Sequence, residues 1–215
     1  MPDWTREVWD LPVWFWLAGR YERRAVRDAS LVIANTDAVT ARMSATYPEW
    51  SDRFFTVMNG CDDETLPRSS GAGRFVATYA GGIYLDRDPR PLFRAVGLFV
   101  SRRQLDPIHF GIELIGDVKH YAGVPVEQLA GEAGVADYVR VCPPVPREQL
   151  LERLAASPLL ISLAQDSPWA IPSKIFEYMQ FNAWLLVMAE HDSPVESLLR
   201  NSDADVVRPD DARAP

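Results

Sequence analysis

Residues 171–179 read IPSKIFEYM and set Lys174 and Glu177 three positions apart, on one face of a predicted helix. A helix N-terminus favours anions because its first amide groups have no partners within the helix. Pro172 lacks an N–H that would stay unpaired in a first helical turn, and Ser173 could cap the amides that remain. The segment therefore predicts a helix start that offers a cation to a phosphate and a carboxylate to a sugar hydroxyl.

A second interpretation of this segment is an ion pair between Lys174 and Glu177 on the surface of a solvated helix. The flanking residues favour the first interpretation. Residues 159–164 are an apolar run that predicts a buried strand, and residues 165–170 form a polar loop that contains proline. A strand, a loop and a helix start in this order form a ligand crevice at the carboxyl end of a parallel sheet.

Glycines follow two further predicted strands. Gly81 and Gly82 follow the strand predicted over 75–79, and paired glycines there let backbone amides approach a diphosphate closely. Arg87 lies in the same loop, where it either neutralises a phosphate or pairs with a neighbouring aspartate. Gly116 ends the next strand and serves either a ligand or a plain turn. These residues predict a phosphate site in the same crevice.

Composition narrows the class of protein. The chain has 215 residues, of which 47% are hydrophobic, and this supports an ordinary globular core. Its formal net charge of −8 argues against broad nucleic-acid binding, because a phosphate backbone demands a basic surface. Cys61 and Cys142 lack metal-ligand spacing and are expected to be reduced cysteines of a cytosolic protein. No run reaches the roughly 20 apolar residues that span a bilayer, and no secretory signal follows Met1.

Helix and strand patterns alternate along the chain without an internal repeat, which is typical of an α/β fold. The elements before residue 65 are too few to close a core, whereas those after it suffice for a doubly wound, Rossmann-like parallel sheet. We therefore expect 1–65 to end one truncated domain, 66–74 to be a linker, and 75–215 to form a second domain. Helices are expected over 8–27, 37–46, 92–102, 126–133, 147–155, 173–182 and 193–200, and strands over 31–35, 54–58, 75–79, 109–115, 138–142, 159–164, 184–189 and 204–207.

Short motifs follow one another along the chain: SLVIANT at 30–36, VMNGCD at 57–62, YAGGIY at 79–84, RDP at 87–89, ELIGD at 113–117, VP at 145–146 and IPSKIFEY at 171–178. In order and spacing they resemble the carboxyl-terminal half of a retaining glycosyltransferase of the GT-B fold, in the large family 4. The resemblance runs from about residue 29 to residue 211. In such enzymes two Rossmann-like domains enclose a cleft, and the carboxyl-terminal domain holds a nucleotide-sugar donor.

The resemblance implies a role for each candidate residue. Glu177 would bond the ribose hydroxyls, while Lys174 and Arg87 would bind the diphosphate. Such enzymes need no metal or other cofactor, and their cationic groups and helix amides stabilise the charge that gathers on the leaving nucleoside diphosphate. The remaining donor-binding residues would be Gly81 and Gly82 at the diphosphate, the backbone near Val145 at the base, and Gly116, Pro172 and Ser173 beside them.

Two positions depart from the family pattern. Many members carry a second glutamate eight positions before the one that matches Glu177, and this chain has Trp169 there. Trp169 is then either a platform on the sugar side or a residue that packs the loop. Many members also place a basic residue directly after the first glycine of the phosphate loop, where this chain has Gly82. That departure places more weight on Arg87 and Lys174.

The acceptor site and a catalytic histidine belong to the amino-terminal domain in this family, and only its last elements are expected here. His109, His120 and His191 fall in a strand pattern and in loops, where structural or exposed histidines are the better interpretation. We therefore expect a fragment without its final helices that binds donor better than it turns it over. The rival functions are a GT-B epimerase or phosphorylase, and a non-catalytic module that binds a nucleotide sugar.

Tryptophans and arginines share the first predicted helix, among them Trp14, Trp16, Arg20, Arg23, Arg24 and Arg27. An interfacial membrane helix has this composition, but acidic residues dilute the charge, and packing of the tryptophans is the stronger alternative. The expected partners are a nucleoside-diphosphate sugar, a saccharide, lipid-linked or small-molecule acceptor, and a weak peripheral membrane contact, without nucleic acid. The expected location is the cytoplasm, including the inner face of the membrane.

Overall fold

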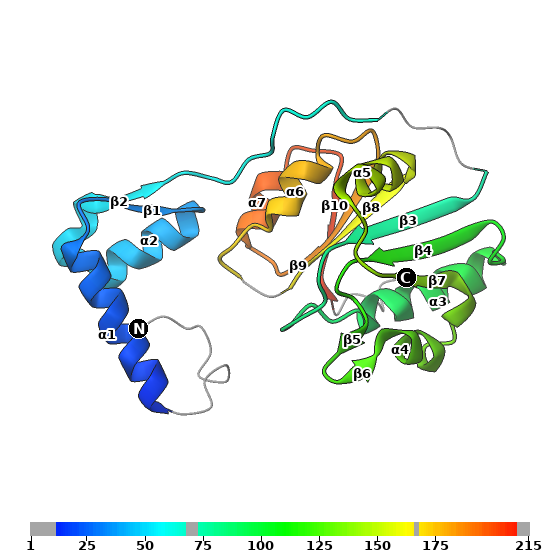
Figure 1. The fold of residues 1–215 in the computed structure, drawn as a ribbon, viewed down its shortest axis with the longest axis horizontal. Helices are drawn as coiled ribbons and strands as arrows, with labels where there is room; N and C mark the ends of the chain where they lie inside the picture. The colour runs from blue at the N-terminus through cyan, green and yellow to red at the C-terminus, as the bar shows by residue number, and fades with distance from the viewer. Residues whose placement is uncertain (1–11, 68–72, 166–167, 210–215) are drawn as a thin grey trace. The chain divides into compact units, whose positions relative to one another are not determined.

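The computed structural model describes residues 12–67, 73–165 and 168–209. The chain forms two compact units, Met1–Asn59 and Gly60–Pro215 (Figure 1). Within the described ranges no helix is long and apolar enough to cross a membrane.

The first unit combines α1 (Pro12–Asp28) and α2 (Asp37–Thr46) with a two-stranded parallel sheet of β1 (Val32–Ala34) and β2 (Phe54–Thr56). α2 starts where the sequence predicts, because the hydroxyl of Thr36 caps it by accepting the Val39 amide at 3.2 Å. A 3-10 helix at Pro48–Arg53, which the sequence patterns did not predict, leads into β2.

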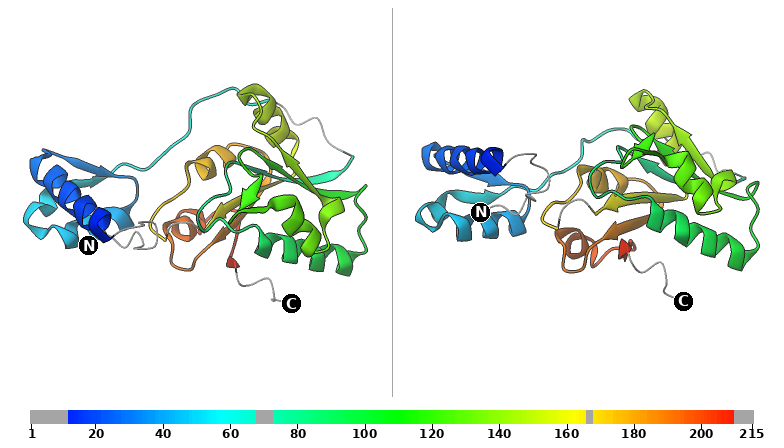
Figure 2. Two further views of the ribbon diagram at one scale, coloured as in Figure 1. Left: turned by 60° about the horizontal axis from the view of Figure 1, so that its bottom comes forward. Right: turned by 90° about the horizontal axis from the view of Figure 1, so that it is seen from below.

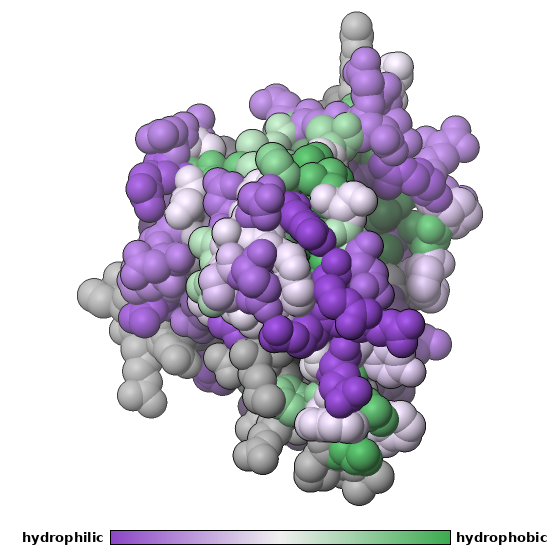
Figure 3. All heavy atoms as spheres, turned by 90° about the vertical axis from the view of Figure 1, so that its left-hand side faces the viewer, coloured by the Kyte–Doolittle hydropathy of each residue, from purple (hydrophilic) through white to green (hydrophobic). Residues whose placement is uncertain are grey.

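The core of this unit is small, with Val26, Tyr47 and Phe54 buried together. Ile33 and Phe55 are paired neighbours on β1 and β2, and their side chains are 59% and 51% exposed. The two-stranded sheet therefore leaves apolar side chains at the surface. Figure 3 shows green hydrophobic side chains between purple hydrophilic ones on one face of the chain.

The second unit is built on a six-stranded parallel sheet with the order β10-β9-β8-β3-β4-β7. This order places β3, the first strand of the unit, beside β8 on one side and β4 on the other. The prediction of a doubly wound, Rossmann-like sheet is confirmed. The strands are β3 (Phe75–Ala80), β4 (Phe110–Ile115), β7 (Val139–Cys142), β8 (Leu159–Ala164), β9 (Trp184–Ala189) and β10 (Asp205–Val207).

Helices cover both faces of this sheet (Figures 1 and 2). Neighbouring residues of β8 show the division, because Ile161 and Leu163 enter one buried cluster while Leu160 and Ala164 enter another. The first cluster includes side chains of α3 and α4, and the second includes side chains of α5, α6 and α7. These helices are α3 (Arg90–Arg103), α4 (Val126–Glu132), α5 (Arg147–Ala156), α6 (Ser173–Tyr178) and α7 (Pro194–Leu199).

Differences from the sequence-based expectations are local. A hairpin of β5 (His120–Tyr121) and β6 (Val124–Pro125) lies where a loop was expected, so His120 belongs to a strand. α6 ends at Tyr178 rather than at residue 182. The expectation that Ser173 caps α6 is wrong: Ser173 is already the first helical residue, and Pro172 holds the cap position, where no side chain bonds the free amides.

Candidate functional site

The strand order of the sheet reverses between β3 and β8. Their pairing runs as far as Tyr79 and Ile161, whereas β3 pairs with β4 as far as Ala80 and Ile115. On the β8 side, the hydroxyl of Tyr178 takes the place of a strand partner for Ala80. It accepts a hydrogen bond from the Ala80 N–H at 2.9 Å and donates one to the Ala80 carbonyl oxygen at 3.2 Å. Doubly wound sheets bind ligands at such a switch point.

Lys174 extends from α6 to the end of β3. Its Nζ donates to the Ala80 carbonyl oxygen at 2.8 Å and to Tyr79 Oη at 3.3 Å. The same atom lies 4.4 Å from the centre of the Tyr79 ring, which adds a cation–π contact. The ammonium is therefore fixed at the carboxyl end of β3, beside the glycine loop.

Gly81 and Gly116 both have backbone conformations that side chains rarely adopt, with φ of +147° and +127°. A Cβ on Gly81 would overlap Lys174 Nζ, and a Cβ on Gly116 would overlap the carbonyl oxygen of Gly81. Gly82 follows, and its carbonyl oxygen accepts the Tyr79 hydroxyl at 2.6 Å. The structure thus brings Gly81, Gly116 and Lys174 into one contact group.

The amides of the two positive-φ glycines already serve the sheet. Gly81 donates its N–H to Ile115 at 2.8 Å, and Gly116 donates its N–H to Cys142 at 3.0 Å. Both N–H groups are therefore used within the sheet rather than offered to a phosphate, and the role of these glycines is to leave room where a side chain would clash. This refines the expectation that the backbone amides of the loop approach a diphosphate.

Arg87 is buried, with 8% of its surface exposed, and its guanidinium lies 4.2 Å from the centre of the Tyr84 ring. Asp88 bonds Arg90, its Oδ1 lying 2.9 Å from Arg90 Nε, and the pairing of Arg87 with Asp86 or Asp88 stays an alternative. The contact of Arg87 with a diphosphate stays a prediction.

Glu177 forms its ion pair with another helix. Its Oε1 lies 2.7 Å from Nη1 of Arg147, the first residue of α5. Arg147 also donates to Glu64 through Nη2 at 2.6 Å and Nε at 3.3 Å. Hydrogen bonding to Arg147 lowers the pKa of Glu64, and the bonds to Glu64 and then Glu177 raise the pKa of Arg147. The side chains of Lys174 and Glu177 thus reach different elements, β3 and α5.

The remaining predicted residues follow the same edge of the sheet. Val145, half-buried, lies in the loop between β7 and α5. Trp169 lies in the loop between β8 and α6 with 39% of its surface exposed, and Pro172 and exposed Ser173 lead into α6. Every predicted site residue therefore comes after the carboxyl end of a parallel strand.

Sequence reasoning missed Tyr178 and Arg147. Tyr178 is 2% exposed, and burial raises the pKa of its phenol, so it remains a neutral donor. The sequence motif contains Tyr178 but does not show that its hydroxyl bonds the backbone of β3. Arg147 did carry a signal, because a cation in the first turn of a helix opposes the helix dipole and implies nearby carboxylates.

The histidines lie outside this group. His109 Nδ1 is 2.9 Å from Asp106, and His191 Nδ1 is 3.2 Å from Glu196, both on exposed side chains. His120 is exposed on β5.

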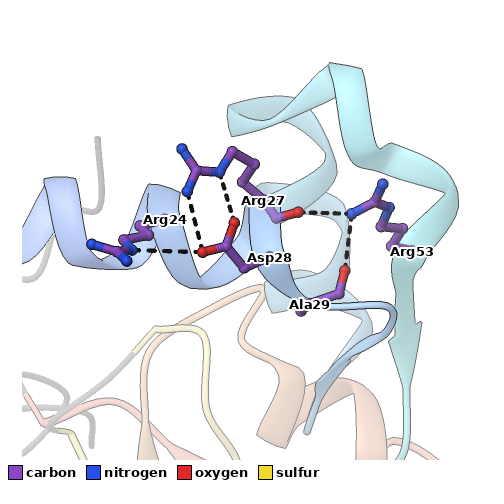
Figure 4. A network of polar contacts seen from close by, with 5 residues as sticks. All are labelled: Arg24, Arg27, Asp28, Ala29 and Arg53. Carbon is purple, nitrogen blue, oxygen red and sulfur yellow. Dashed lines mark hydrogen bonds and ion pairs between the residues drawn. The ribbon is translucent and has the colours of Figure 1, made fainter.

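The arginines of α1 are engaged within the first unit. Arg24 and Arg27 both contact Asp28, at 3.6 Å and 2.7 Å (Figure 4). Arg53 donates to the carbonyl oxygens of Arg27 and Ala29 at 3.0 Å and 2.9 Å. Asp28 thus neutralises part of this basic surface, and membrane contact stays a prediction.

No protein-family model and no curated protein matches the chain. Solved structures do. HepE from Anabaena, solved with UDP-glucose, matches with a TM-score of 0.66 and 18% identity over 88% of this chain and 52% of its own. A glycosyltransferase from Rickettsia africae ESF-5 matches with a TM-score of 0.63 and 13% identity over 96% of this chain and 55% of its own. Sucrose-phosphate synthase from Thermosynechococcus elongatus matches with a TM-score of 0.61 and 15% identity over 91% and 49%.

The chain therefore spans about half the length of the solved structures that it matches. At these identities the likeness concerns the fold, and the sheet order agrees with it. The chain has the fold of the carboxyl-terminal domain of GT-B glycosyltransferases, with a six-stranded Rossmann-like sheet.

Proposed function

We propose that this chain carries the donor-binding half of a retaining glycosyltransferase, which transfers a sugar from a nucleoside-diphosphate sugar to an acceptor. The observation that carries the proposal is the contact of Lys174 with Gly81 and the end of β3 at the switch point of a GT-B-type sheet. The UDP-glucose in HepE supports a nucleotide-sugar ligand for this fold. In this proposal residues 1–65 end the acceptor-side domain, residues 66–74 form the linker, and residues 75–215 bind the donor. The contact of Glu64 with Arg147 places the last residues of the first segment against the second unit, which begins at Gly60 in the structure.

The chemistry assigned to the site is stabilisation of a leaving group. When the glycosidic bond breaks, negative charge gathers on the nucleoside diphosphate, and a fixed cation there binds the transition state more strongly than the ground state. Lys174 and Arg87 supply that charge without a metal. Glu177 accepts hydrogen bonds from the ribose hydroxyls, and the loop at Val145 meets the base.

Calorimetric titration of the chain with UDP, GDP and dTDP tests the proposal. Lys174→Ala and Glu177→Ala are each expected to weaken binding of the preferred nucleotide about 10- to 100-fold, since charge-assisted hydrogen bonds contribute about 1.5–3 kcal/mol. The control is Arg102→Ala, which removes an exposed cation from the last turn of α3. Unchanged affinity in both site variants would refute the assignment.

A non-catalytic module that binds a nucleotide sugar is the second candidate. The residue that favours it is Trp169, at the position where many family 4 enzymes carry a glutamate. Donor binding without transfer by the full-length protein would select this candidate. Epimerisation or hydrolysis without an acceptor would instead indicate a related GT-B enzyme. The acceptor, the cytoplasmic location and the membrane contact remain predictions.

A further inference from the structure

Three charged side chains form a row across the second unit. Glu64 lies in the segment that precedes β3, Arg147 begins α5, and Glu177 lies on α6. Arg147 stands between the two carboxylates, 2.6 Å from Glu64 Oε2 and 2.7 Å from Glu177 Oε1. Segments far apart in the sequence thus meet at one guanidinium.

We propose that Arg147 is a positioning residue that aims the Glu177 carboxylate at the ribose hydroxyls of the nucleotide, and this role rests on the proposed function. The ion pair uses Oε1 of Glu177. The second carboxylate oxygen, Oε2, is then the acceptor assigned to the ribose, because an ionised carboxylate has about four acceptor sites.

The guanidinium is itself held in a fixed plane. Arg147 bonds Glu64 through both Nη2 and Nε, at 2.6 Å and 3.3 Å, which uses the planar fork of arginine. Its third nitrogen, Nη1, is left to face Glu177. A lysine at this position would keep the charge but could not make this two-sided contact. Glu64 thus orients Arg147, and Arg147 orients Glu177.

The burial of the three groups fits this order. The Glu177 side chain is 22% exposed, that of Glu64 is 36% exposed and that of Arg147 is 51% exposed. Glu177 is therefore the member least able to reorient in water, and the arginine limits it further. Because Arg147 also follows the loop of Val145, the row connects the segment assigned to the base with the residue assigned to the ribose.

A purely structural role, in which Arg147 only ties α5 to the preceding segment, would lower stability without changing which nucleotides bind. The readout that separates the two roles is the ratio of affinities for a nucleoside diphosphate and its 2′,3′-dideoxy counterpart. We would titrate UDP, GDP and ADP, each beside its dideoxy analogue, into the folded wild-type chain and variants.

The wild-type chain is expected to bind the preferred ribonucleotide at least about 10-fold more tightly than its dideoxy analogue, because the ribose hydroxyls bond a charged acceptor. Arg147→Ala should reduce that ratio to about 3 or less, and Glu177→Ala should do the same. The double variant should show no further loss, because both changes break one interaction. Arg140→Ala is the control, since Arg140 is an exposed arginine, 3.7 Å from Glu113 on β4.

The possible outcomes separate the two proposals. A wild-type ratio retained in Arg147→Ala, with a lower melting temperature, would leave Arg147 a structural residue and overturn the inference. Should Arg147→Ala fail to fold, Arg147→Lys decides the question, and an unchanged ratio there also overturns it. Equal binding of both nucleotides by the wild-type chain would refute the ribose contact while diphosphate binding stands. No binding of any nucleotide would refute the proposed function and this role with it.

Discussion

The two sides of the candidate crevice are built differently. On the β3 side, Gly81, Gly116, Lys174 and Tyr178 interlock through backbone groups and buried contacts. On the α5 side, Glu177 is held by charge, through the half-exposed guanidinium of Arg147. Shape therefore fixes the side that we assign to the diphosphate, whereas electrostatics fixes the side that we assign to the ribose. The first should respond to added volume, and the second to loss of charge.

The largest effect is expected from Gly116→Ala. The new Cβ would overlap the Gly81 carbonyl oxygen, and φ of +127° is strained for alanine. Because the overlapped atom belongs to the backbone, we expect the free energy of unfolding to fall by about 2–5 kcal/mol, together with lost nucleotide binding. Urea denaturation followed by circular dichroism measures this change.

Gly131→Ala is the matched control for this substitution. A Cβ on Gly131 of α4 would meet nothing within 4 Å, so alanine should leave stability unchanged or raise it by up to about 1 kcal/mol. If both substitutions had similar small effects, the close contact between the β3 and β4 loops would not exist as described.

A smaller loss of stability is expected from Tyr178→Phe. The change removes the acceptor of the buried Ala80 N–H, and an unpaired buried donor costs about 1–3 kcal/mol. Tyr21→Phe serves as the control, because that side chain is 72% exposed. Equal unfolding midpoints for the two variants would show that Tyr178 does not complete the ladder at the switch point.

Most of the fold could be predicted from the sequence because its signals are local. The strand over 159–164 is an apolar run bounded by polar residues, and α2 begins at a threonine cap. The hairpin of β5 and β6 escaped prediction because its strands have only two residues each, too short to show an alternating pattern.

The candidate site was predictable in part. Lys174 and Glu177 stood out by type and spacing, but their partners come from β3 and α5, which lie far away in the sequence. The role of Tyr178 depends on where the pairing of β3 with β8 ends. A single sequence does not show which residues of two strands pair with each other. Ser173 does not act as the expected cap because α6 begins at Ser173 itself, whereas a capping residue must stand just before the first helical residue.

The smallest effect is expected from Glu64→Gln. Arg147 lowers the pKa of Glu64 in the folded chain, so this pair stabilises the fold above the unfolded pKa of about 4.3 and ceases to do so as pH falls through the lower folded value. The variant should therefore melt slightly below the wild-type chain at pH 7, by at most about 2 °C, and the difference should vanish in acid. A difference that grew on acidification would contradict the ion pair.

A crystal structure of the chain bound to the nucleoside diphosphate that it prefers in titration tests the assignment of the two sides directly. We predict the diphosphate within hydrogen-bonding distance of Lys174 Nζ beside Gly81, and the ribose hydroxyls on Glu177 with Arg147 still in contact with that carboxylate. A nucleotide bound elsewhere on the chain, or one whose ribose faces Lys174 while its phosphates lie at Glu177, would contradict this arrangement.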